Sequence, residues 1–199
     1  MKISFIGAGN VASNLGNLFS KAGHSVEYGT PNPKVAQISI KEACKKGEIV
    51  CFAIPYGAMS GVLTENKEFL KGKIVVDITN AINIQDWSPL LLGEENSGGE
   101  ETSKLLQESR VVKAFNTVFA DVMNPGKQEF QKQKLTVFIA SDDNDAAEKV
   151  RQLAEDAGFE GLVVGALKNS RYLEAIAHLN IAIALGGGGT DAGLKYFRR

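Results

Sequence analysis

The sequence predicts an α/β fold in which helices cover both faces of a doubly wound parallel sheet. Short apolar runs of roughly six residues alternate with helical patterns along most of the chain, as expected for repeated strand–helix–strand units. A glycine-rich turn joins the first apolar run to the first helical pattern. Hydrophobic residues make up 44% of the 199 residues, enough to bury a sheet on both faces. We therefore expect a single domain over residues 1–199.

The elements follow in order from this alternation. The expected strands are the apolar runs at residues 2–7, 24–29, 48–54, 73–78, 110–115, 135–140 and 161–166. The expected helices are Asn10–Ala22, a short helix to Lys46, Gly57–Leu70, Asp145–Ala157 and Asn169–Leu185. Ser39 and Glu42 form a capping box for the short helix, and Asp142–Asp143 can cap the fourth.

Two loops interrupt the alternation. Residues 83–99 form a long loop that carries Trp87, the only tryptophan, and residues 126–134 form a polar, charged loop. Loops of this length are usually lids, binding loops or mobile segments. One interpretation is that the Trp87 loop closes over a binding site.

Composition excludes several functions. Basic and acidic residues number 22 and 23, so the chain offers no basic field for nucleic acid and no polybasic stretch for a membrane surface. The first residues enter a strand pattern without the apolar core of a signal peptide. Cys44 and Cys51 do not form a redox motif and are expected to be reduced, buried thiols of a cytoplasmic protein. We find no clustered metal ligands and expect no metal.

The stretch IGAGNVASNLG, residues 6–16, reads G-x-G-x-x-A between a strand and a helix. Gly7 permits the tight turn, Gly9 lets the backbone approach a pyrophosphate, and Ala12 takes the position of close packing. The amides of Asn10 and Val11 then face the ligand at the positive end of the helix. We expect a Rossmann-type fold that binds a dinucleotide; a tight turn without ligand is the alternative.

The end of the second strand favours NADP(H) over NAD(H). NAD sites carry an acidic residue there to hold the ribose 2′-hydroxyl. Here Thr30 occupies that place and Lys34 follows, whereas Glu27 comes about three residues too early. Thr30 can donate a hydrogen bond to a 2′-phosphate and Lys34 can supply a charge. Alternatively, Lys34 only solvates the start of a helix.

Further candidate residues follow the next strands. Pro55 ends the third strand and turns the chain across the nucleotide, and Tyr56 offers an aromatic face beside it. Asn80 follows the fourth strand and Asn116-Thr117 the fifth. The carboxyl ends of parallel strands form the crevice in which such folds bind ligands. An amide such as Asn116 can bind a carboxamide or a ribose.

Several motifs resemble those of a known family. AIPYGA (53–58), KIVVDITN (73–80), VVKAFNTV (111–118), FIASDD (138–143) and NSRYLEAIA (169–177) occur in this order after IGAGN. Together they resemble the NADP oxidoreductase, coenzyme F-420-dependent family, which includes NADPH:deazaflavin reductases. The cytosolic domains of six-transmembrane ferric reductases belong to the same wider group. Their haem-bearing membrane domain has no counterpart in these residues.

The resemblance implies a set of roles. Ala53 and Ile54, with Pro55 and Tyr56, would contact the cofactor, and the loop from Ala114 to Val118 would pass beside the nicotinamide. The activity implied is hydride transfer between NADP(H) and a flavin or deazaflavin as small-molecule second substrate. Relatives often carry Ser-Arg after the second strand, where this chain has Thr30-Pro31. The missing arginine could weaken discrimination against NAD.

Hydride transfer of this kind needs no protein acid or base, and we assign no catalytic residue. Reduction of a carbonyl or imine would need a positioned proton donor, for which Lys113 and Tyr56 are the nearby candidates. A sensor or scaffold that binds NADPH without turnover is a third hypothesis. His24 is interpreted as structural. His178 is interpreted as a core or interface residue, with a substrate contact as the alternative, and Asp77 as a turn or cap residue or a functional one. Phe115 is as readily a core residue as a site residue.

The C-terminal helical segment, residues 168–199, contains more apolar residues than one core can cover. Ile176, Leu179, Ile181, Ile183 and Leu185 cannot all face the same way on a helix. We infer a homodimer with this helix in the interface and the glycines 186–189 near the second substrate. Alternatively, the helix covers the far side of the sheet and leaves apolar residues exposed.

Overall fold

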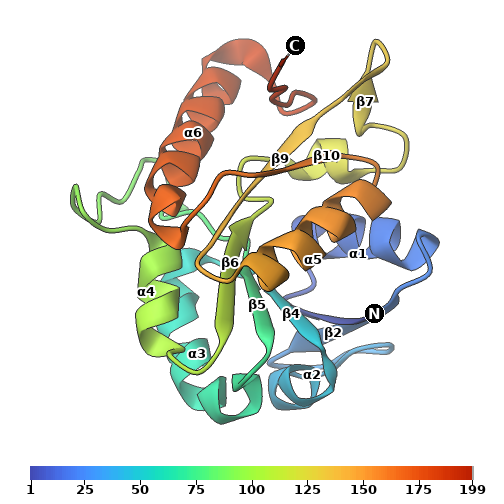
Figure 1. Ribbon diagram of the computed structural model, residues 1–199, viewed down its shortest axis with the longest axis vertical. Coiled ribbons are helices and arrows are strands. Elements are labelled where there is room, and N and C mark those ends of the chain that lie inside the picture. The colour runs from blue at the N-terminus through green and yellow to red at the C-terminus, as the bar shows by residue number, and fades with distance from the viewer. Residues whose placement is uncertain (199) are drawn as a thin grey trace.

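The computed structural model describes residues 1–198 and contains a twisted eight-stranded sheet with the order β10-β9-β6-β5-β4-β1-β2-β3 (Figure 1). Its strands are β1 (Lys2–Ile6), β2 (Ser25–Thr30), β3 (Ile38–Ser39), β4 (Ile49–Phe52), β5 (Ile74–Asp77), β6 (Arg110–Ala114), β9 (Thr136–Ser141) and β10 (Glu160–Val163). The helices are α1 (Asn10–Lys21), α2 (Ile40–Lys46), α3 (Tyr56–Leu70), α4 (Gly98–Leu105), α5 (Asn144–Asp156) and α6 (Ser170–Ile183). Arg199, the last residue of the expected C-terminal segment, lies outside the described residues.

The expected doubly wound α/β fold is confirmed. Apolar side chains of the strands point to both faces and form two clusters. One, with Phe5 and Phe19, packs under α1 and α5; the other, with Phe52 and Leu63, packs under α2 and α3. Figure 1 shows α3 and α4 on one side of the sheet and α1 and α5 on the other. Burial on both faces explains why the strands are continuous apolar runs.

Two strands, β9 and β10, depart from the expected parallel arrangement; they run parallel to each other and opposite to the rest of the sheet. β9 runs antiparallel to β6, with Ala114 opposite Ile139 and Val112 opposite Ser141. The connection between them, residues 115–135, holds a 3₁₀ turn (Ala120–Met123) and a hairpin of β7 (Glu129–Phe130) and β8 (Gln133–Lys134), and no crossover helix. Because an antiparallel strand begins where its neighbour ends, this connection stays at the carboxyl ends of the sheet.

Both expected loops contain regular structure. The loop expected at 83–99 ends two residues early, because α4 begins at Gly98 with Ser97 as its cap; the hydroxyl of Ser97 accepts a hydrogen bond from the Glu100 amide. Residues 126–134 contain the β7–β8 hairpin, whose turn residues Gln131 and Lys132 have positive φ angles. That pair of angles is typical of a type I′ turn.

Helix α6 crosses the carboxyl ends of β5 and β6. A ring nitrogen of His178 lies 3.1 Å from the carbonyl oxygen of Ala81, and the Asn180 side chain donates to the carbonyl of Thr117. A π-helical turn, Ala184–Gly188, follows α6, and the tail then returns to β9, where the Thr136 amide donates to Leu194. Among residues 1–198, no helix is long and apolar enough to cross a membrane.

Candidate functional site

The glycine turn after β1 packs against the end of β4. Gly7 has a φ of 107°, and a Cβ at this position would lie 2.4 Å from the carbonyl oxygen of Ala53. The Gly7 amide donates to the carbonyl of Gly29 at 2.9 Å, which ties the turn to β2. Both the backbone angle and the close approach therefore require glycine here.

Gly9 faces open space. It is the residue before α1, a Cβ built on it would meet no protein atom within 4 Å, and no side chain caps the helix. The first turn of α1 also carries no acidic residue. The amides of Asn10, Val11 and Ala12 are thus left at the positive end of a helix dipole, an arrangement that binds phosphate groups.

A cleft of about 480 Å³ opens beside this turn. It is lined by Asn10 and Val11 from α1, by loop residues that follow β5 and β6, and by one face of α6. Of the sequence-predicted site residues, Asn80, Asn116 and Thr117 line it together with Asn10 and Val11. The cleft lies at the carboxyl ends of the strands, where open α/β sheets bind their ligands.

The floor of the cleft holds two buried polar atoms without partners. The Asn80 side chain donates to the carbonyl of Asn116 at 2.8 Å, and the Asn116 Nδ2 donates to Asn80 Oδ1 and to the carbonyl of Leu173. A carbonyl can only accept, so the Asn116 amide orientation is fixed and its Oδ1 points away from Leu173. Asn116 Oδ1 and Thr117 Oγ1 have no hydrogen-bond partner among the described residues, although the two residues are only 6% and 2% exposed.

Phe115 places these two residues. Its φ is 62°, a conformation that a bulky side chain rarely adopts. The ring is 1% exposed and meets Phe19 edge-on with 6.0 Å between centroids, so the side chain is a core residue. The strained backbone turns the chain out of β6 and presents Asn116 and Thr117 to the cleft, as strain often does beside functional sites.

Lys113 is buried in an ion cluster beneath this floor. Its ammonium lies 3.3 Å from Asp77 and 2.9 Å from Glu174, and it donates to the carbonyl of Thr79 at 2.7 Å. Burial by itself would lower the pKa of Lys113, but the two carboxylates outweigh burial and raise it. Thr102 donates to the second oxygen of Asp77. Lys113 does not line the cleft, so its position favours a structural role.

Tyr56 is likewise held by a carboxylate. Its hydroxyl donates to Glu101, and its ring lies against Gly98 at the start of α4. Burial and the neighbouring Glu101 raise the pKa of Tyr56, which makes it a weaker acid. Ala53 and Ile54 are partly buried beside the glycine turn, Pro55 precedes α3, and Ala114 is buried in the core.

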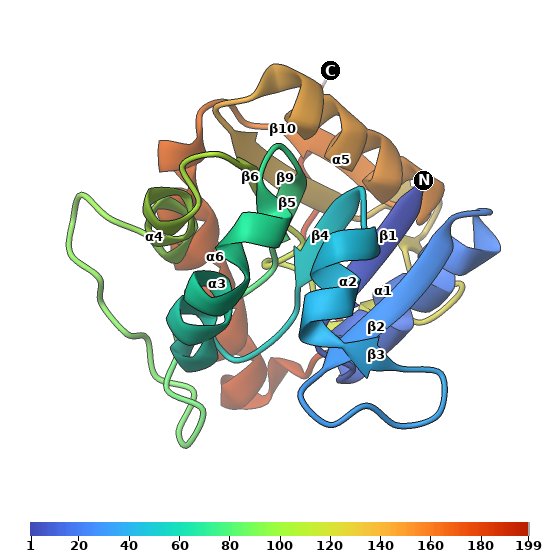
Figure 2. The same ribbon diagram turned by 90° about the horizontal axis from the view of Figure 1, so that it is seen from below.

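Thr30 and Lys34 are brought together by a residue that the sequence analysis missed. The Thr30 hydroxyl and the Lys34 amide lie 3.1 Å from the same Oε1 of Gln37. The loop that carries Lys34 joins β2 to β3 and projects from the body of the molecule (Figure 2). Nothing in the local pattern marks Gln37, because its role depends on how this loop returns to β3.

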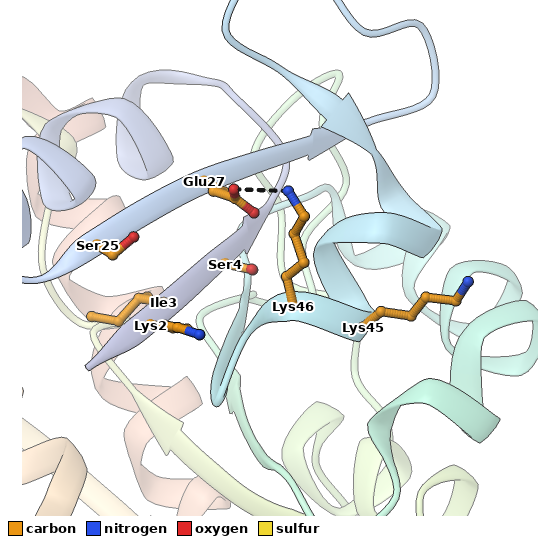
Figure 3. Close-up of a pocket in the computed structure, with 7 residues that line it drawn as sticks. All are labelled: Lys2, Ile3, Ser4, Ser25, Glu27, Lys45 and Lys46. Atoms are coloured by element: carbon orange, nitrogen blue, oxygen red, sulfur yellow. Dashed lines mark hydrogen bonds and ion pairs between the residues drawn. The ribbon is translucent and has the colours of Figure 1, made fainter.

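Glu27 faces elsewhere. Its carboxylate pairs with Lys46 of α2 at 3.0 Å, in a hollow of about 460 Å³ lined by Lys2, Ser4 and Lys45 near the start of β1 and the end of α2 (Figure 3). This hollow does not include the glycine turn. Glu27 is therefore not placed to bind a ribose hydroxyl at the carboxyl end of β2.

Comparison with known proteins agrees with the family resemblance that the sequence motifs indicated. Residues 2–81 match the model of the family NADP oxidoreductase coenzyme F420-dependent. Over these residues the chain is similar to members of that family. It is 32% identical to the F420-dependent NADP reductase of Methanocaldococcus jannaschii over 152 residues, 72% of this chain and 65% of the reductase. The resemblance inferred from the sequence motifs is thereby confirmed.

Metalloreductase STEAP3 of Rattus norvegicus is 29% identical over 183 residues, 88% of this chain and 36% of the metalloreductase. The chain thus spans about a third of that relative. A solved structure from Arthrobacter sp. FB24, of a protein assigned as an F420-dependent NADP reductase, covers all of both chains with a TM-score of 0.90 and 24% identity. At that identity the likeness establishes the fold.

Proposed function

We propose that the chain binds NADP(H) and transfers a hydride between its nicotinamide and a flavin-like or deazaflavin acceptor. The observation that carries the proposal is the pair of unpartnered atoms, Asn116 Oδ1 and Thr117 Oγ1, buried at the floor of the cleft. Buried polar atoms without partners are rare and costly, and a bound ligand is one way to satisfy them.

A dinucleotide fits both ends of the cleft. The open amides at the start of α1 suit a pyrophosphate. A nicotinamide carboxamide offers an N–H donor for Asn116 Oδ1 and an oxygen that the Thr117 hydroxyl can donate to. These two residues would thus orient the reactive ring, and α6 would cover it.

When bound, the nicotinamide supplies the hydride chemistry itself. The chain has to orient the two rings and exclude water. Among the described residues that line the cleft, Asp121 is the only titratable one, and it accepts a hydrogen bond from Thr190 at the mouth. Lys113 and Tyr56, the donors that carbonyl or imine reduction would need, are held by carboxylates and line no part of the cleft.

A parallel titration with NADPH and NADH tests the proposal, with the fluorescence of Trp87 at the cleft as the readout. We expect NADPH to bind at least tenfold more tightly, about 1.4 kcal/mol, and to quench or shift the Trp87 emission. Oxidation of NADPH by flavin or deazaflavin acceptors then tests turnover. Absence of binding would overturn the proposal, and binding without turnover by any acceptor would favour the sensor hypothesis.

The proposed setting is a cytoplasmic homodimer with residues 168–198 as the dimerisation segment. Tyr172, Leu179 and Gly186 recur every seven residues on α6 and the turn after it, with Ala175 and Ala182 between them, and all five are exposed. This spacing suits the pairing of two helices. Leu179 is 62% exposed, and a second copy would cover it.

A further inference from the structure

We propose that Gln37 reads the 2′-phosphate of NADP(H) in this chain, which has Pro31 where relatives carry an arginine. The inference rests on the proposed NADP(H) function and adds a specificity-determining residue to it.

The orientation of the Gln37 side chain follows from its partners. The backbone N–H of Lys34 can only donate, so the Gln37 atom 3.1 Å from it must be the oxygen Oε1. That same oxygen lies 3.1 Å from Thr30 Oγ1, and the Thr30 hydroxyl must therefore donate to it. Both contacts occupy Oε1 and leave the two N–H donors of Nε2 on the other side of the amide.

Thr30 is consequently not free to donate to a phosphate. A threonine hydroxyl has one proton, and here it goes to Gln37. Within residues 1–198, no acceptor lies within hydrogen-bond distance of Gln37 Nε2, and this atom is not enclosed by protein. The side-chain amide of Gln37 and the ammonium of Lys34 are thus two available donors near the end of β2.

The loop around Gln37 is built to hold this amide in place. Residues 31–36 are exposed, with prolines at 31 and 33, and Ala36 has a φ of 65°. The backbone N–H of Gln37 donates to the carbonyl of Lys34 at 3.0 Å. β3 begins at the next residue and pairs Ile38 with Gly29. Gln37 is therefore anchored from both sides while its Nε2 stays free, and it lies where dinucleotide folds distinguish a 2′-hydroxyl from a 2′-phosphate.

Gln37→Glu separates the two roles of this side chain. Glutamate keeps an oxygen that accepts from Thr30 and Lys34, so the loop geometry is retained, but it replaces the Nε2 donor by a negative oxygen. Asn32→Asp is the matched control, because it adds the same charge in the same exposed loop. Dissociation constants for NADPH and NADH are measured for the whole chain and both variants.

We expect Gln37→Glu to weaken NADPH binding at least tenfold and to leave NADH within twofold of the unaltered chain. Asn32→Asp should change NADPH binding less than threefold. If Gln37→Glu weakens NADPH binding no more than Asn32→Asp does, the loss is a non-specific electrostatic effect of the added charge and the assignment is overturned. Equal losses of NADPH and NADH binding would also overturn it. If the unaltered chain binds neither nucleotide, the proposed function itself fails, which is a distinct result.

Discussion

The ammonium of Lys113 on β6 lies 2.9 Å from a carboxylate oxygen of Glu174 on α6. The two carboxylate oxygens of Glu174 also accept from the amides of Gly98 and Gly99 at the start of α4. The Glu174 side chain thus links β6 to the start of α4 and to its own helix, α6. The Asn116 side chain donates a hydrogen bond to the carbonyl of Leu173, the neighbour of Glu174. The ion pair between Lys113 and Glu174 therefore also supports the floor of the cleft.

Lys113→Met should destabilise the fold strongly. The substitution leaves Asp77 and Glu174 buried without a counter-charge, which typically costs about 3–5 kcal/mol. Urea unfolding followed by circular dichroism measures the loss. A triple variant that neutralises the cluster, Lys113→Met with Asp77→Asn and Glu174→Gln, should recover most of it. A single variant as stable as the unaltered chain would show that the cluster contributes little.

The same cluster predicts a dependence on alkaline pH. The pKa of Lys113 is raised above its ordinary value of 10.5, so its stabilisation is complete below that pH and is lost as pH rises through the folded-state value. The free energy of unfolding should therefore fall above about pH 10.5. The fall should be shallower in the triple variant. Parallel pH profiles of the two proteins would contradict this prediction.

Thr117→Val should stabilise the free protein and weaken cofactor binding. It removes a buried hydroxyl that has no partner, so the free energy of unfolding should rise by about 1 kcal/mol. It also removes a hydrogen bond to the ligand, worth about 0.5–1.5 kcal/mol of NADPH binding. Thr117→Ser keeps the hydroxyl and serves as the matched control. A valine variant that binds NADPH normally would exclude Thr117 from the site.

Lys34→Ala should reduce NADPH binding by about 1–3 kcal/mol, the scale of a hydrogen bond to a charged group. NADH, which lacks the 2′-phosphate, should bind the variant as before. Lys41→Ala on α2 removes an equal charge from a different element and is the control. If NADPH binding is the same with and without Lys34, this lysine only solvates its loop.

The strands could be predicted from the sequence because burial on both faces makes them continuous apolar runs. α4 was missed because Gly98 and Gly99 begin it, although Ser97 and Glu100 form the capping pattern that marks its start. These glycines are explained only by the fold, since a Cβ on Gly99 would lie 2.7 Å from the Ser170 hydroxyl.

The site was predictable to a similar extent. Asn80 and Asn116 follow strands, so their place at the carboxyl ends could be inferred. The burial of Lys113 could not, because its partner Glu174 lies 61 positions away in the chain (174 − 113) on an element whose packing no local pattern reveals. Gln37 likewise depends on the return of a loop to a two-residue strand.

Leu179→Glu should prevent the proposed dimer. Leu179 lies at the centre of the exposed apolar stripe of α6, and a carboxylate there would have to be buried between two helices. Sedimentation at micromolar concentration should give twice the mass of one chain for the unaltered protein and a single chain for the variant. Leu91→Glu, at a still more exposed leucine outside α6, should remain dimeric. A monomeric unaltered protein would remove the proposal, and α6 would then be a helix that covers the sheet edge with its apolar side exposed.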